Sequence, residues 1–133
     1  MQVVVFTLGE GHYAFRTDQI DEISKTKPVS RMPNAQDWVE GLVNLRGEIV
    51  VLVNLEKILD KEVTGEYNNF IIVKTGDSKA GILVRDVKEV TDIEPSQIEK
   101  LSDRDSVGVS GIVQMDDRIV NYVDIGDLME QRG

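Results

Sequence analysis

Apolar residues occur along this chain in short runs separated by turn-forming residues, and the clearest case is residues 40–55. There, two runs rich in Val, Ile and Leu are broken once, at Arg46-Gly47. Runs of this length that are split by a short Gly-containing connection predict a β-hairpin. Gly47 can adopt the positive φ required at the second central position of a type II turn or in a bulged turn. Arg46 is then expected at the hairpin tip, and residues 56–59 are expected to form one closing helical turn.

Further hairpins and a terminal helix are predicted on either side of this central hairpin. Each hairpin consists of two apolar runs joined by residues that favour turns. The paired runs are residues 3–8 with 12–16, residues 70–74 with 80–84, and residues 107–115 with 118–123. Residues 124–131 place Ile125, Leu128 and Met129 on one face and are therefore predicted to form an amphipathic helix.

The apolar pattern repeats within the chain. Ile20 and Ile23 correspond to Val87 and Val90 at an offset of 67 residues, and the hairpin at 41–55 corresponds to 111–125 at an offset of 70. Such repeats usually mark duplicated supersecondary units, and short strands at this spacing favour small barrels. Each half, about 1–66 and about 67–133, is marginal alone on surface-to-volume grounds. We therefore predict one all-β domain in which two interleaved barrel subdomains pack on a shared hydrophobic seam.

The tips of the two repeated hairpins differ in charge. The first carries Arg46 and Gly47, whereas the second carries Asp116 and Asp117. A core does not require such a difference, so it points to the surface, where loops held by a rigid scaffold often carry function. Two interpretations of Arg46 stay open, a solvated turn cation and a recognition residue.

Size and composition disfavour several classes of function. The chain has 133 residues, of which 41% are hydrophobic, and a formal net charge of −9. Its Lys and Arg residues are not clustered, which disfavours nucleic acids and anionic membrane surfaces as partners. The chain has no Cys, and therefore neither a disulfide framework nor a thiolate metal site. We recognise neither a signal peptide nor a membrane-spanning run, and we expect a cytoplasmic protein.

The sequence gives little support to catalysis. His12 is the only histidine, and no second His or Cys completes a nucleophile–base pair or a zinc site. The segment Gly9-Glu10-Gly11 lacks the strand–loop–helix context of a phosphate-binding loop. Asp116 and Asp117 are adjacent in a turn and are expected to stay solvated rather than hold a metal ion. We therefore predict no catalytic residues, no metal and no cofactor.

Ile20 and Ile23 form an apolar pair that follows a predicted strand, with Glu22 between them. Burial in the core is one interpretation of this pair. The other is a surface at the seam between the barrels, edged by Glu22 and Arg46. Such a surface would accept the apolar face of a partner helix.

Residues 39–55, which include Asn44-Leu45-Arg46-Gly47, resemble the signature of the CheW family of chemotaxis coupling proteins. The resemblance extends over nearly the whole chain. It includes residues 5–8, 13–15, Ile20 with 22–23, 81–84 with Val87, 111–113 and 123–125. The family pattern commonly has proline where this chain has Val51, which restores a backbone N–H to that strand.

The resemblance implies two SH3-like five-stranded barrels with an apolar groove between them. It also implies a non-catalytic adaptor that joins the CheA histidine kinase to the cytoplasmic signalling tips of chemoreceptors, the methyl-accepting chemotaxis proteins. By position, it implies receptor or array contacts for Arg46, Gly47, Thr17, Ile20, Glu22, Ile23 and Val87. It places the kinase contacts only loosely, on the second barrel. Two alternatives stay open: a small-molecule sensor that uses the groove between the barrels, and a CheW-like regulatory domain of a CheA- or CheV-type protein.

Overall fold

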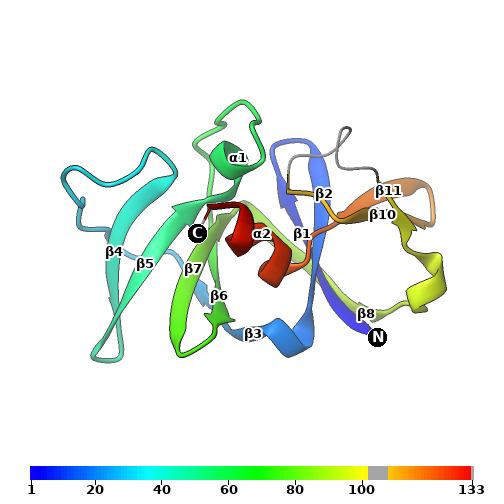
Figure 1. Cartoon of the computed structure of the whole chain (residues 1–133), viewed down its shortest axis with the longest axis horizontal. Helices are drawn as coiled ribbons and strands as arrows, with labels where there is room; N and C mark the ends of the chain where they lie inside the picture. The colour runs from blue at the N-terminus through cyan, green and yellow to red at the C-terminus, as the bar shows by residue number, and fades with distance from the viewer. Residues whose placement is uncertain (102–107, 133) are drawn as a thin grey trace.

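The computed structural model describes residues 1–101 and 108–132, and its strands form two sheets (Figure 1). Sheet A has the order β8-β1-β2-β11-β10-β9. Its strands are β1 (Gln2–Leu8), β2 (Gly11–Arg16), β8 (Asp86–Asp92), β9 (Glu99–Lys100), β10 (Gly111–Met115) and β11 (Arg118–Tyr122). Sheet B has the order β3-β6-β7-β5-β4. Its strands are β3 (Ile20–Lys25), β4 (Val39–Leu45), β5 (Glu48–Asn54), β6 (Asn69–Thr75) and β7 (Ser78–Val84).

The predicted all-β fold is confirmed, and each sheet forms one SH3-like subdomain. The predicted hairpins are present as β1–β2, β4–β5, β6–β7 and β10–β11. Residue 107, where the first strand of the last hairpin was predicted to start, lies outside the described residues. The central hairpin therefore lies at one edge of sheet B, with its tip at the end of the molecule (Figure 1).

The two sheets have the same internal order. The strands β1, β2, β3, β4 and β5 correspond, in that order, to β6, β7, β8, β10 and β11. When each strand in the order β8-β1-β2-β11-β10 is replaced by its counterpart, the order β3-β6-β7-β5-β4 results. Each sheet thus combines early and late strands, and β2 lies beside β11 in Figure 1. The β-bulges also correspond, because Asp21 is left out of the β3–β6 register and Lys88 is left out of the β1–β8 register.

Short helices connect the strands. They are η1 (Thr17–Gln19), α1 (Leu55–Ile58), η2 (Pro95–Gln97) and the terminal helix α2 (Ile125–Arg132). The side chain of Asn54 caps α1, since its Oδ1 accepts a hydrogen bond from Lys57 N at 3.1 Å. Asp124 has the corresponding place before α2, and its Oδ1 accepts from Asp127 N at 3.1 Å. The helical turn after the central hairpin and the terminal helix are therefore confirmed.

The largest group of buried side chains lies between the sheets, and we call it the seam cluster. It includes Phe6 and Phe15 from sheet A, Ile71 and Val73 from sheet B, and residues of both α-helices such as Leu55. The ring centroid of Phe6 lies 4.7 Å from that of Phe15. Separate clusters fill the interior of each subdomain. The shared hydrophobic seam predicted from the repeat is therefore present, and it is packed with side chains.

Val51 occupies an interior strand. It pairs with Leu42 of β4 on one side and with Ala80 of β7 on the other. Proline is largely confined to edge strands and bulges because it cannot donate to a ladder. A residue with a backbone N–H therefore suits this position.

We expect Gly41→Ala to lower the free energy of unfolding by about 3 kcal/mol, measured by urea denaturation. Gly41 has φ +151°, and a Cβ there would lie only 2.2 Å from the Ser30 carbonyl oxygen. That oxygen accepts a 2.8 Å hydrogen bond from Leu42 N, which fixes its position. Gly65→Ala is the matched control, because Gly65 has φ +78° and open space around it. Equal losses for the two variants would contradict a steric role for Gly41.

Candidate partner-binding site

The tip of the central hairpin is a two-residue turn. Leu45 pairs with Glu48, and both loop residues have positive φ, +53° at Arg46 and +86° at Gly47. This is the pattern of a type I′ turn, whose backbone twist matches that of paired strands. The predicted type II or bulged turn is therefore wrong, because Arg46 also adopts the left-handed conformation. The turn directs an Arg46 side chain that is 76% exposed toward solvent.

Asn44 explains part of the local sequence pattern. Its Oδ1 accepts a hydrogen bond from Gly47 N at 2.9 Å. Asn side chains often bond nearby backbone in this way and stabilise turns. The Asn three residues before Gly47 therefore fixes the geometry of the tip.

Ile20, Glu22 and Ile23 belong to strand β3, and the prediction that they only follow a strand is wrong. Successive residues of a strand point to opposite faces, so a spacing of three normally separates two side chains. Here Asp21 is bulged, and Ile20 and Ile23 pair with Val73 and Ile71, which both belong to the seam cluster. The bulge therefore gives the two isoleucines the same face despite their spacing.

Arg46 and Glu22 form an ion pair between Nη2 and Oε2. β3 and β4 are the two edge strands of sheet B, and the pair joins β3 to the turn that follows β4. We call this end of the subdomain its mouth. Glu22 is the less accessible partner, with a side chain 27% exposed, against 76% for Arg46. Glu22 thus holds a guanidinium whose remaining donors are open to solvent or to a partner.

Lys79 belongs to the same mouth and was missed by the sequence analysis. Its Nζ lies 3.1 Å from both Asp21 Oδ2 and Glu48 Oε1. The hydrogen bond to Asp21, followed by that to Glu48, raises the pKa of Lys79 above its usual value. The parallel pairing of β5 with β7 creates this contact, and the sequence around Lys79 contains no signal for it.

Of the other predicted residues, Ile20 and Val87 lie along the seam, and Thr17 and Ile23 lie in η1 and β3. Thr17 is in η1, where its Oγ1 donates to Gln2 Oε1 at 3.1 Å. Ile20 and Val87 are half-buried and pack against the seam cluster. Ile23 is 40% exposed. The structure therefore places Arg46, Gly47 and Glu22 at the charged mouth and Ile20 and Val87 at the seam edge.

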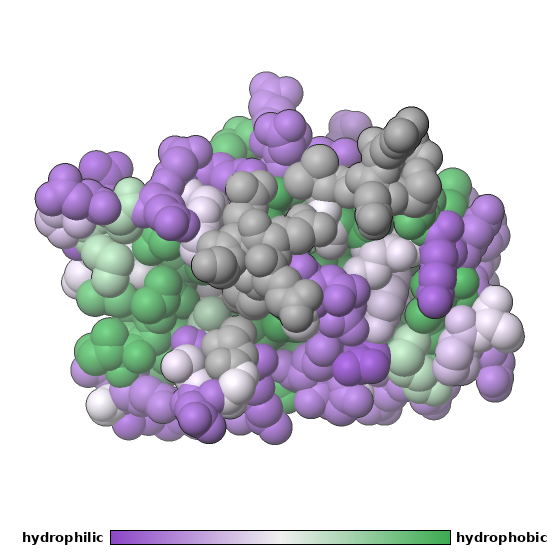
Figure 2. Space-filling model, viewed as in Figure 1, coloured by the Kyte–Doolittle hydropathy of each residue, from purple (hydrophilic) through white to green (hydrophobic). Residues whose placement is uncertain are grey.

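Apolar side chains are also exposed on the outer faces of both sheets. Figure 2 shows such residues gathered at the left of the view, over β4 and β5, and Ile49 of β5 is 61% exposed. The corresponding residue of the other sheet is Ile119 of β11, which is 54% exposed. Exposed apolar patches of this kind often mark interaction surfaces.

The fold defines a class of protein: two interlocked SH3-like subdomains that share strands and present turns and sheet faces as surfaces. The profile of the CheW-like domain family matches residues 2–133. The chain belongs to this family.

Named relatives and a solved structure agree with this assignment. The chain is 32% identical to "Chemotaxis protein CheW" of Thermotoga maritima, over 98% of this chain and 88% of that protein. It is 28% identical to part of "Chemotaxis protein CheA" of Treponema pallidum, over 80% of this chain but only 13% of that protein. The crystal structure of the scaffolding protein TtCheW from Thermoanaerobacter tengcongensis aligns with a TM-score of 0.87 and 29% identity, over 96% of this chain and 86% of that one.

Within the described residues, we find no helix that combines the length and apolar character needed to cross a bilayer.

Proposed function

We propose that this chain is a non-catalytic adaptor that couples chemoreceptors to the CheA histidine kinase in chemotaxis. The observation that carries the proposal is the family match over residues 2–133, joined to a solved scaffolding protein of the same fold. An adaptor acts by binding two partners at once, which raises the effective concentration of each for the other. In this function the protein works in the cytoplasm, at receptor arrays that it reaches through its partners.

We place the receptor contact on the charged mouth and the adjoining seam edge. Arg46 is held at one guanidinium nitrogen by Glu22 and is otherwise exposed, so it has donors available for a carboxylate or a helix C-terminus. Ile23 supplies an exposed apolar side chain nearby on β3, the strand that carries Glu22. The remaining members of this proposed surface are Gly47, Thr17, Ile20 and Val87. Together they suit an amphipathic helix with an acidic group at its edge.

We place the kinase contact on the other subdomain, sheet A. The exposed Ile119 gives that sheet an outward apolar residue at the position that Ile49 has in sheet B. Contacts on separate subdomains would allow both partners to bind together. The T. pallidum relative named CheA contains a segment similar to this chain, which supports a CheW-like surface as a kinase element.

Arg46→Asp is expected to reduce receptor binding at least about tenfold, because it removes a charge-assisted contact worth about 1.5–3 kcal/mol. Its free energy of unfolding should change by less than about 1 kcal/mol, since an exposed ion pair contributes little. The measurement is a pull-down with a CheA kinase and a receptor cytoplasmic fragment, each alone and then together. Arg31→Asp is the control, because Arg31 is exposed in the loop before β4.

Three outcomes separate the parts of this proposal. A wild-type chain that bridges both proteins, with a mutant that loses only the receptor, supports the adaptor and the role of Arg46. Normal receptor-dependent kinase activation by a well-folded Arg46→Asp variant would refute the site assignment. A wild-type chain that binds neither protein would refute the adaptor function itself.

A further inference from the structure

The mouths of the two subdomains are built from corresponding residues. Glu22 lies directly after the bulged Asp21 and pairs with Ile72, and Glu89 lies directly after the bulged Lys88 and pairs with Val5. Each mouth also contains the first residue of a two-residue hairpin loop with φ +53°, Arg46 in sheet B and Asp116 in sheet A. The remaining corresponding pairs are Glu48 with Arg118 and Lys79 with His12.

The charges in the two mouths are different. In sheet B, the carboxylate of Glu22 is paired with the guanidinium of Arg46. In sheet A, Glu89 keeps the carboxylate, but the loop residue that should neutralise it is Asp116. Among the side chains that the structure describes, neither the Glu89 carboxylate nor the Asp116 carboxylate has a hydrogen bond or an ion pair. In the mouth of sheet A, the position of Arg46 is therefore occupied by a second carboxylate.

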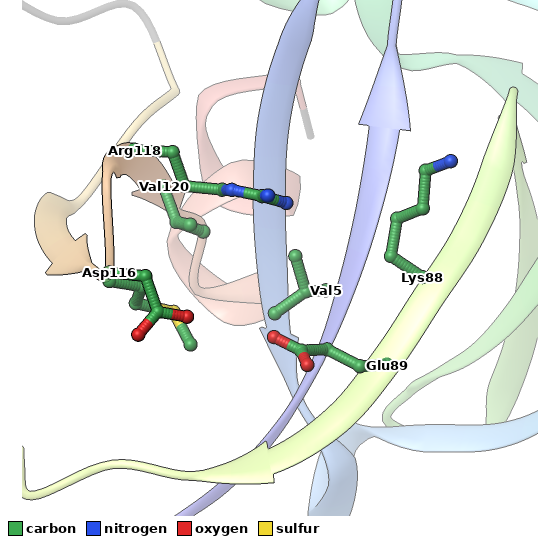
Figure 3. A pocket seen from close by; sticks show the side chains of 7 residues that line it. Val5, Lys88, Glu89, Asp116, Arg118 and Val120 are labelled. Atoms are coloured by element: carbon green, nitrogen blue, oxygen red, sulfur yellow. The ribbon is translucent and has the colours of Figure 1, made fainter.

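A pocket of about 210 Å³ lies at this place in sheet A. Figure 3 shows the carboxylates of Glu89 and Asp116 on either side of it, with Val5 and Val120 above them in the view. Val5 and Val120 are almost fully buried, so the exposed lining is mostly polar, and two carboxylates that face one space suit the planar fork of an arginine. In the mouth of sheet B, the carboxylate of Glu22 has no need of an external arginine, because Arg46 is already in contact with it.

The two cations that also line the pocket form no ion pair with Glu89 or Asp116 among the described side chains. The guanidinium of Arg118 lies 3.8 Å from Asp117 through Nε and 3.2 Å from His12 Nε2 through Nη1. Partial burial, followed by the charges of Arg118 and Lys88, lowers the pKa of His12, so its neutral ring accepts from Arg118. Figure 3 shows the amine of Lys88 turned away from both carboxylates. Glu89 and Asp116 are therefore left for an external cation.

We propose that this pocket binds the guanidinium of an arginine presented by a partner protein, between Glu89 and Asp116. The partner's arginine forms with Glu89 the ion pair that, in sheet B, Arg46 forms with Glu22 of the same chain. The proposal adds a site on sheet A to the surfaces above, and it holds or fails independently of which protein the adaptor joins.

The test uses a capped arginine, Nα-acetyl-L-arginine amide, titrated into the isotopically labelled protein and followed by NMR. We expect saturable shifts at Val5, Glu89, Asp116 and Val120, with a dissociation constant of about 1 mM, as for one exposed charge-assisted contact. Glu89→Gln and Asp116→Asn should each weaken binding about tenfold. Asp92→Asn is the matched control, because Asp92 is an exposed carboxylate on the same strand, outside the pocket.

The neutral isostere, capped citrulline, separates a charge-specific site from loose association. Equal shifts with citrulline, no saturation with arginine, or equal weakening by Asp92→Asn would overturn the proposal. Tighter binding of free L-arginine than of the capped form would also overturn the partner assignment. In that outcome, the α-carboxylate would be recognised by Lys88 or Arg118, and the site would belong to a small molecule.

Discussion

Phe6→Ala should lower the free energy of unfolding by about 4 kcal/mol, a large part of the 5–15 kcal/mol typical of a whole domain. Phe6 is fully buried, and its ring contacts those of Phe15 and Tyr13 in the seam cluster. Removing the ring deletes buried apolar area and leaves a cavity between two sheets. Both surrounding layers are fixed by their own ladders, so the cavity cannot close fully.

This loss should be visible at a distance from the substitution. Trp38 precedes β4 of sheet B and packs against the seam cluster, so its fluorescence reports on the subdomain that does not contain Phe6. We expect Trp38 fluorescence and far-UV circular dichroism to show one shared transition, shifted equally by Phe6→Ala. Val3→Ala, inside sheet A and away from the seam, is the control with a smaller loss of about 2 kcal/mol. Separate transitions would show that the subdomains unfold independently.

Asn54→Asp should cost about 3 kcal/mol at neutral pH, although the two side chains have the same shape. Asn54 is fully buried, and its Nδ2 donates to Glu40 Oε1 at 2.8 Å and to the Tyr67 hydroxyl at 2.9 Å. The single Tyr67 hydroxyl proton is already donated to Glu56 Oε1 at 2.6 Å. Burial and that hydrogen bond raise the pKa of Tyr67 to about 12, so the phenol stays protonated. An aspartate would thus replace two donors with a charge facing acceptors.

The loss in Asn54→Asp should shrink as the pH falls from 7 to 5. Burial and the carboxylate of Glu40 raise the pKa of the introduced carboxyl in the folded protein above its unfolded value. The folded variant therefore binds more protons than the unfolded chain, and its stability rises with decreasing pH. Urea denaturation of variant and wild type at several pH values measures this difference.

The reciprocal substitution Asp124→Asn is the control for Asn54→Asp. Asp124 occupies the corresponding cap of α2, where Asn serves equally well, so we expect a change within about 0.5 kcal/mol. A loss at Asn54 that did not depend on pH would exclude the buried charge as its cause.

The hairpins and the terminal helix could be predicted because they depend on local apolar runs and turn residues. The conformation of Arg46 could not, since a left-handed arginine is uncommon and the two-residue loop length decides it. The bulge at Asp21, which gives Ile20 and Ile23 one face, depends on pairing with the distant β6. The sequence placed Glu22 and Arg46 at the edge of the same surface, but it did not predict the ion pair between them. Lys79 reaches Asp21 and Glu48 because β5 and β7 pair in parallel, and no local sequence pattern predicts that pairing.

The pairing of β2 with β11 has a consequence for the order in which the protein is completed during its synthesis. Asn121 donates to the carbonyl of His12 at 3.0 Å, across a sequence separation of 109 residues. On the ribosome, sheet B has all its strands once β7 has emerged, whereas β1 and β2 must wait for β8, β10 and β11. The strands made first are thus the last to find all their neighbours. During that interval β2 presents an unpaired edge, and such an edge is a template on which another nascent chain can pair.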